Sequence, residues 1–295
     1  MKRLNILWIG LISVLMTACY DDYEKDYDKS SVYFASQKPL RTLVADTDMS
    51  IKVGVAIGGK REVHTDDWAT FEIDPSLLDG TGLTLMPENY YQLANPNKMT
   101  ISNPNLAIAD VKVTFSDAFY EDNAALNKHY AIPFRLVDHN QDEISTDVNG
   151  NLKDYSIVVV KFVSQYHGTY FVKGKVTNLS TQQVTEYSNK DLSQNMTRDF
   201  VSLGRNKVRR PGFGNTLENN ESVNLTVNPD GSVNIEAGGS VAITDASATL
   251  DPAAELKQPK FTLSYKYTKG GVTYQVDEEL IRRQNPEADL RFQEW

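Results

Sequence analysis

Cysteine is almost missing from this chain: Cys19 is the single one among 295 residues. A disulfide within the chain is therefore excluded, and zinc sites built on several cysteines are excluded with it. The core has to be held together by side-chain packing alone. The length is sufficient for two ordinary domains that each bury a core.

Positive charge and long apolar runs are also scarce. The chain has 30 lysines and arginines against 39 aspartates and glutamates, which gives a net charge of −9. Such a surface lacks the overall basic footprint of a nucleic-acid-binding protein, so we expect no nucleic acid partner. Beyond residues 1–18, no apolar stretch approaches the length that spans a bilayer.

Recognisable catalytic and metal-binding motifs are missing as well. No HExxH pattern, other metal spacing or G-x-S-x-G elbow involves the four histidines or the serines. Carboxylates are plentiful, but nothing in their spacing pairs two of them for glycoside hydrolysis. We therefore expect no metal, no cofactor and no enzymatic activity. A glycan-active enzyme is kept as the third choice for the function, after the two non-catalytic roles given at the end of this subsection.

Two runs of alternating oxygen-bearing side chains, at 138–142 and 147–151, are similar to the start of a calcium loop. Glu143 and Leu152 stand where an EF-hand needs glycine, and neither run ends in the required glutamate. A polar hairpin loop is the preferred interpretation of both runs.

The N-terminus has the pattern of a secretory signal, which we assign to residues 1–18. Two cations precede an apolar core at 4–16, and two small residues precede Cys19. Small residues followed directly by cysteine resemble a bacterial lipoprotein signal, although Met16 stands where leucine is usual. The resemblance implies that Cys19 is lipidated and anchors the protein to a membrane. An ordinary secretory signal with an incidental cysteine is the alternative.

An acidic tether follows at residues 19–30. Five of the nine residues from Tyr20 to Asp28 are acidic, and the run has no helical or strand periodicity. Acidic residues just after a lipidated cysteine resemble the export signal of Bacteroidetes lipoproteins. The resemblance implies an outer-membrane location, facing the cell exterior.

Apolar and polar residues alternate at period two along most of the remaining chain. In the first half, alternation is clearest at 51–57 and 130–136, whereas 155–163 is apolar on both faces at its centre. Seven or eight such strands over 31–164 predict a β-sandwich. A short helical turn is expected at 117–126, with Ser116 as its cap.

The second half, 165–295, repeats the pattern and predicts a second all-β domain. Residues 222–237 read as a hairpin around Asn-Pro-Asp-Gly, and 261–276 read as a hairpin that turns at a Gly-Gly pair. Neighbouring hairpins favour an up-and-down β-barrel or a second sandwich. The boundary is expected at 164–167, with a short linker.

Several segments together resemble a two-domain family of Bacteroidetes surface lipoproteins. They lie at 32–44, 53–62, 71–80, 85–93, 113–122, 129–138, 160–176 and 290–295. The resemblance implies an immunoglobulin-like domain of unknown function followed by a second β domain of unknown function. Family members occur in polysaccharide-utilisation loci beside a TonB-dependent importer, which implies a polysaccharide or oligosaccharide ligand. The family offers no catalytic or binding motif to carry over.

Sugar recognition needs flat aromatic faces against pyranose CH groups, with polar neighbours for the hydroxyls. Aromatic residues outside the clearest alternating segments are the best candidates, although core packing is the alternative for each of them. The candidates are Trp68, Tyr90, Tyr91, Tyr166 and Phe213.

The segment 205–215, RNKVRRPGFGN, concentrates four cations in an otherwise acidic chain. Its proline and glycines predict a loop. Arg209 and Arg210 are candidates for contacting an anionic ligand. A solvated loop, or an ion-paired clasp onto the first domain, is the preferred alternative.

Taken together, these patterns favour a lipid-anchored surface protein that binds glycan without catalysis for uptake by an outer-membrane importer. The rival is a structural role, either in an importer complex or as a pilus-like adhesin subunit that relies on strand exchange. A C-terminal strand that completes its own domain would favour the binder, and a detachable one would favour the adhesin.

Overall fold

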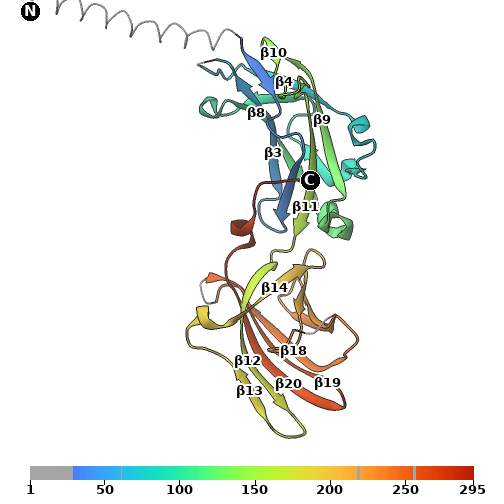
Figure 1. The fold of residues 1–295 in the computed structure, drawn as a ribbon, viewed down its shortest axis with the longest axis vertical. Coiled ribbons are helices and arrows are strands. Elements are labelled where there is room, and N and C mark those ends of the chain that lie inside the picture. Colours follow the sequence, from blue (N-terminus) through green and yellow to red (C-terminus); the bar gives the residue numbers. More distant parts are fainter. Residues whose placement is uncertain (1–28, 61, 218–219, 255–256) are drawn as a thin grey trace, which may run out of the picture.

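The computed structural model describes residues 29–60, 62–217, 220–254 and 257–295, and it consists of two β domains stacked end to end (Figure 1). Most regular elements are strands, and α2 (Asp117–Glu121) is the one short α-helix among the described residues, so the predicted all-β class is confirmed. The leader, Cys19 and the tether up to residue 28 lie outside the described residues. Within the described part of the chain, no helix is long and apolar enough to cross a membrane.

The first domain contains a sheet of 12 strands. Ten of them follow the order β10-β1-β3-β8-β7-β4-β9-β11-β2-β21, and the other two, β5 and β6, pair with β9 and β8, respectively. The strands are β1 (Ser31–Tyr33), β2 (Pro39–Val44), β3 (Ser50–Gly58), β4 (Trp68–Ile73), β5 (Thr84–Leu85), β6 (Tyr91–Leu93), β7 (Lys98–Ile101), β8 (Ile108–Phe115), β9 (Tyr130–His139), β10 (Glu143–Ile144), β11 (Tyr155–Val163) and β21 (Gln293–Glu294). The pair β3–β8 is separated from the pair β9–β11 by two strands in the sheet, yet side chains of both pairs belong to one core. The sheet therefore folds over itself as a sandwich.

The alternating sequence explains how these strands are buried. Along β3, the side chains of Ile51, Val53 and Val55 face the core, and their neighbours face outward. Strand β11 is different, because Ser156 to Val160 are all buried. The run that is apolar on both faces is thus a central strand, between β9 and β2.

Helical segments are short and lie between the strands. The predicted turn at 117–126 is present as α2 (Asp117–Glu121) and the 3₁₀ helix η5 (Asn123–Leu126). Ser116 does not cap α2 through its side chain, because its hydroxyl donates to the Asn89 carbonyl at 2.7 Å. The other 3₁₀ helices are η2 (Pro75–Leu78), η3 (Glu88–Tyr90), η4 (Pro104–Leu106), η6 (Leu192–Gln194) and η8 (Pro286–Asp289).

The second domain contains a nine-stranded sheet with the order β17-β16-β15-β14-β12-β20-β19-β18, and β13 pairs with β12. The strands are β12 (Gly168–Asn178), β13 (Val184–Tyr187), β14 (Met196–Ser202), β15 (Lys207–Pro211), β16 (Ser222–Val227), β17 (Val233–Ala237), β18 (Ile243–Asp251), β19 (Lys260–Lys269) and β20 (Val272–Arg282). The end strands β17 and β18 contact each other, so the sheet curls into a barrel. Its interior is filled with side chains.

Both predicted hairpins of the second domain are present. Strand β16 pairs with β17, and β19 pairs with β20, each in antiparallel register. Gly270 and Gly271 have φ values of 58° and 77°. Positive φ at both central residues is what a two-residue hairpin turn of type I′ requires, which explains the Gly-Gly pair.

The second domain was predicted to extend over 165–295, but the C-terminal tail, residues 283–295, leaves it. After β20 the chain returns to the first domain, where β21 pairs with residues Pro39 and Leu40 of β2 (Figure 1). The indole of Trp295 donates to the Ile157 carbonyl at 2.8 Å and packs against the apolar cluster that contains Leu40. The last residues therefore belong to the first sheet. A strand of two residues is too short to show alternation, so the sequence pattern could not reveal it.

Candidate functional site

The predicted residues Tyr90 and Tyr91 pack against the core of the first domain. The Tyr90 hydroxyl donates to the Asp122 carboxylate at 3.0 Å, and its ring lies edge-on to Tyr130 with centroids 5.5 Å apart. The hydrogen bond to Asp122, together with burial, raises the pKa of Tyr90. The structure thus gives Tyr90 a structural role, in which its hydroxyl and one ring contact are already used.

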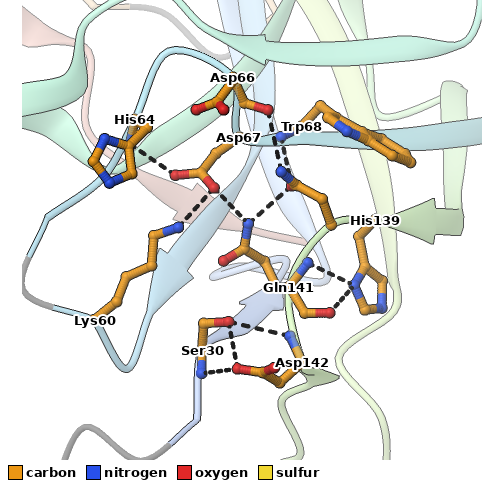
Figure 2. A network of polar contacts seen from close by, with 10 residues as sticks. Ser30, Lys60, His64, Asp66, Asp67, Trp68, His139, Gln141 and Asp142 are labelled. Carbon is orange, nitrogen blue, oxygen red and sulfur yellow. Dashed lines mark hydrogen bonds and ion pairs between the residues drawn. The ribbon is translucent and has the colours of Figure 1, made fainter.

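Trp68 lies at the start of β4, beside a network of polar contacts (Figure 2). Its backbone N–H donates to the Asn140 side chain at 2.9 Å. The Lys98 ammonium lies 5.0 Å from the centroid of the indole ring. One face of this predicted ligand-binding ring is therefore already occupied by a cation–π contact.

The network of Figure 2 is centred on the buried carboxylate of Asp67. Asp67 accepts hydrogen bonds from Lys60 Nζ at 2.6 Å, the His64 backbone N–H at 2.8 Å and Gln141 Nε2 at 2.9 Å. Burial raises the pKa of Asp67, but these donors outweigh it and the pKa is lowered. The carboxylate is thus saturated by the protein and ties together two loops of the first domain.

The two predicted calcium-like runs are hydrogen-bonded loops. Asp147 accepts from the backbone N–H groups of Asn149 and Asn151 at 2.8 and 2.9 Å. Asp142 accepts from the backbone and hydroxyl of Ser30, each at 2.7 Å. Among the described residues, no group of three or more acidic, histidine or cysteine side chains could hold a metal ion.

Arg210 and Phe213 are wrong as ligand-binding residues, because both side chains are buried inside the second domain. Arg210 forms an ion pair with Glu278 at 2.8 Å, and both side chains are fully buried. Phe213 stacks on Tyr267 with ring centroids 4.7 Å apart. Arg209 alternates with Arg210 on β15 and is exposed. It makes no side-chain interaction with another described residue.

The segment 205–215 is therefore not one exposed loop. Residues 207–211 form β15, and alternation along this strand turns Val208 and Arg210 inward. Gly212 and Gly214 have φ values of 71° and 50°, so the chain turns sharply on both sides of Phe213. A side chain at Gly214 would lie 2.5 Å from Val176. The glycines thus serve tight packing rather than a flexible loop tip.

Tyr166 is the predicted aromatic residue that lies at an open site. It lines a groove of about 730 Å³ between the two domains, to which we refer as the junction groove. The walls come from the β2–β3 turn, α2, the linker, the β14–β15 and β16–β17 turns and the end of β18. The residues that carry its chemistry are Asp46, Glu121, Tyr166, Arg205, Asn206 and Leu250.

Arg205 fixes the two walls of the junction groove relative to each other. From the second domain, its Nη2 donates to Asp46 at 2.6 Å and its Nη1 donates to Asp117 at 2.8 Å, both in the first domain. The hydrogen bond to Asp46 raises the pKa of Arg205. The clasp onto the first domain, the preferred interpretation of this basic segment, is therefore made by Arg205.

Three polar groups in the junction groove are free. The Tyr166 hydroxyl and the side chains of Asn206 and Glu121 make no hydrogen bond with any described residue. Burial raises the pKa of Tyr166, and the charge of Asp46 raises it further, so the hydroxyl stays protonated at neutral pH. The groove thus offers donors and acceptors next to apolar surface from Leu250 and the Tyr166 ring.

Sequence reasoning missed Asn206, Glu121 and Asp46 as groove residues. They come from three separate turns or helix ends, and nothing in their spacing marks them. The one feature of the sequence that indicated a site here was the position of Tyr166 at the predicted domain boundary, since ligand sites often lie between domains.

Two family models match the chain: one described as an N-terminal domain, over residues 27–143, and one described as a C-terminal domain, over residues 154–281. No curated protein matches. A structural-genomics protein of unknown function from Bacteroides ovatus has a TM-score of 0.74 at 19% identity, covering 87% of this chain and 95% of that one.

Two further Bacteroides ovatus structures are more distant. A multidomain protein including DUF1735 has a TM-score of 0.40 at 12% identity, covering 90% of this chain and 99% of that one. A second structural-genomics protein of unknown function has a TM-score of 0.40 at 15% identity, covering 91% of this chain and 100% of that one. The chain therefore has a two-domain architecture, in which an N-terminal and a C-terminal family domain follow one another in a fold shared with a Bacteroides protein of unknown function.

Proposed function

We propose that this protein binds a polysaccharide or oligosaccharide in the junction groove without catalysis, and that it presents the glycan to an outer-membrane importer. The observation that carries the proposal is the combination of a half-buried tyrosine ring with an unpaired hydroxyl, amide and carboxylate in one groove. A saccharide has matching chemistry, because apolar CH faces alternate with hydroxyl groups around its rings.

Charge pairing in the groove supports binding rather than hydrolysis. Glycoside hydrolysis needs two carboxylates, one of them able to carry a proton. The Asp46 carboxylate accepts two hydrogen bonds from Arg205, at 3.0 and 2.6 Å, and is therefore engaged in the ion pair that joins the two domains. Only Glu121 of the groove carboxylates is left unpaired among the described residues.

A glycan array followed by calorimetry on the selected glycan tests the proposal. We expect Tyr166→Ala and Asn206→Ala each to weaken binding about tenfold, which corresponds to about 1.4 kcal/mol. Tyr33→Ala is the matched control, because Tyr33 is a half-buried tyrosine in β1, outside the groove. Unchanged affinity in both groove variants would disprove this site. Release of reducing ends that Glu121→Gln abolishes would move the protein to the enzyme class.

The same proposal includes the cellular location of the protein, which is the outer face of the outer membrane. A lipidated Cys19 would hold the chain to the outer membrane, and the acidic tether would direct it to the outer face. The described chain begins beside β1 and β10, at the end of the first domain that lies away from the second domain (Figure 1). An anchor there would leave the junction groove projecting from the membrane, where a polymer can reach it.

The rival structural or adhesin role receives some support from β21. This strand completes the first sheet rather than its own domain, and only two residue pairs join it to β2. A detachable strand is what strand exchange needs. Chains that form concentration-dependent oligomers through the β2 edge would favour the rival, and a monomer at all concentrations would favour the binder.

A further inference from the structure

A second hollow lies at the domain junction, and residues of the C-terminal tail form part of its lining. Its volume is about 380 Å³, and we call it the tail pocket. Both domains, the linker and the tail contribute to it, so it exists in this form only while the tail is docked. Its charged and titratable residues are Lys161, His167, Asp199, Arg283, Asp289 and Arg291.

The cations of the tail pocket form no ion pair with any residue that the structure describes. Lys161 of β11 and Arg283 after β20 make no side-chain hydrogen bond or ion pair with any described residue. The position of Arg283 is nevertheless fixed, because its backbone N–H donates to the Thr169 carbonyl at 2.8 Å. Within the described part of the chain, Arg291 donates only to the carbonyls of Ala288 and Leu290, at 3.1 and 3.2 Å.

The carboxylates of the tail pocket are occupied by neutral donors instead. Asp199 accepts from the Thr169 hydroxyl at 2.6 Å, and Asp289 accepts from the Gln284 amide. Neither forms a salt bridge with Lys161 or Arg283. Three cationic side chains and two carboxylates therefore line the pocket, which gives it an excess of positive charge in a chain of net charge −9.

His167 lines the tail pocket, so its pKa can report whether an anion is bound there. Its Nδ1 lies 3.3 Å from the Ser202 hydroxyl. Burial lowers the pKa of His167, and the charge of Lys161 lowers it further, while Asp199 and Asp289 act in the opposite direction. A bound anion would favour the imidazolium and raise this pKa.

We propose that the tail pocket binds the carboxylate or sulfate group of an acidic saccharide, with Lys161 and Arg283 as its cationic partners. The planar guanidinium of arginine suits both anions, because it donates two parallel hydrogen bonds to either. Thr42 and Gln293 add hydroxyl and amide groups at the same site for the sugar hydroxyls. This inference rests on the proposed glycan-binding function and specifies the class of glycan.

Calorimetry on the full chain with trigalacturonate, a chondroitin sulfate tetrasaccharide and neutral maltotetraose tests the proposal. We expect the acidic probes to bind more tightly, and their affinity to fall as salt rises. Lys161→Gln and Arg283→Gln should each weaken acidic binding about tenfold, allowing for partial exposure. Lys112→Gln is the matched control, since Lys112 is an exposed cation on β8, outside the tail pocket and without a side-chain partner among the described residues.

The outcomes separate this inference from the function on which it rests. If saccharides bind but Lys161→Gln and Arg283→Gln leave the affinity for acidic probes unchanged, the tail pocket is disproved and glycan binding stands. If no saccharide binds, an NMR titration of His167 with glucuronate and with sulfate judges the pocket alone. A raised His167 pKa in the wild type, absent in Arg283→Gln, supports an anion site; an unchanged pKa overturns it.

Discussion

At the scale of single residues, the most consequential one is Arg210, which the sequence presents as a surface cation. In the barrel its guanidinium lies 2.8 Å from Glu278, which also accepts hydrogen bonds from Tyr187 and Tyr265 at 3.2 and 3.3 Å. Burial raises the pKa of Glu278, and Arg210 and the tyrosine hydroxyls oppose this. Arginine stays protonated in proteins, so Arg210 fixes a charge in the core that needs Glu278 as its partner.

We predict that breaking this pair costs more than removing it. Arg210→Met leaves the Glu278 carboxylate buried without its cation and should lower the free energy of unfolding by about 3–5 kcal/mol. The double variant Arg210→Met with Glu278→Leu should recover most of that loss, because no charge remains buried. Urea denaturation followed by circular dichroism measures both. A double variant as unstable as the single one would contradict the argument.

Arg205 supports a second prediction at this scale. Arg205→Ala removes the ion pairs to Asp46 and Asp117, and these exposed or half-exposed contacts should contribute about 1 kcal/mol in total. The larger effect should be on the relative orientation of the domains, measured as a broader distance distribution in small-angle X-ray scattering. Arg209→Ala, with no such pairs, should behave as the wild type. An unchanged distribution in Arg205→Ala would show that other contacts hold the domains.

At the scale of elements, the C-terminal tail acts as a strap across the junction. Strand β21 supplies two residue pairs to β2, and the Trp295 backbone N–H donates to the Lys38 carbonyl at 3.1 Å. The Lys38 ammonium lies 5.3 Å from the centroid of the Trp295 ring. So short a strand gains its stability chiefly from this one side chain.

We predict that Trp295→Ala releases the strap. The half-buried indole should contribute about 1–2 kcal/mol, less than the value for a fully buried tryptophan. Hydrogen exchange should rise at residues 40–44 of β2 and at the tail, and the tail pocket should lose its affinity for acidic probes. Phe292→Ala is the control, because Phe292 is largely exposed. Undisturbed exchange in β2 after Trp295→Ala would contradict the strap.

At the scale of the whole molecule, two β domains meet end to end (Figure 1). They are linked by the ion pairs of Arg205 to the first domain and by the C-terminal tail, whose strand β21 pairs with β2. The junction groove and the tail pocket are each lined by both domains. Binding at either site should therefore depend on the links that hold the two domains in one relative orientation. The far end of the first domain carries the start of the described chain, which is the end we expect to face the membrane.

We predict that Cys19→Ala releases the protein from the membrane fraction or leaves an unprocessed precursor. The reason is that acyl chains attached to the cysteine would provide the anchor, at about 0.8 kcal/mol for each buried CH₂ group. Replacing the acids between Asp21 and Asp28 with amides should remove the protein from the cell surface, as measured by protease accessibility on whole cells. Aspartate-to-glutamate changes are the charge-preserving control. Normal processing and retention of Cys19→Ala would refute the anchor.

The sequence alone determined what depends on neighbours along the chain. Period-two alternation predicted strands such as β3 and β9, a fully apolar run predicted the central strand β11, and a Gly-Gly pair marked the β19–β20 turn. These features are local, because side-chain direction and turn geometry are set within a few residues.

Only the tertiary structure decided which surfaces meet. The burial of Arg210, the inward turn of Phe213 and the return of Trp295 to the first sheet depend on residues 68, 54 and 138 positions away, respectively. The junction groove likewise joins turns from both domains around Tyr166. Such contacts leave no periodic trace in the sequence, since their free energy depends on how closed sheets pack and not on the order of residues within any one strand.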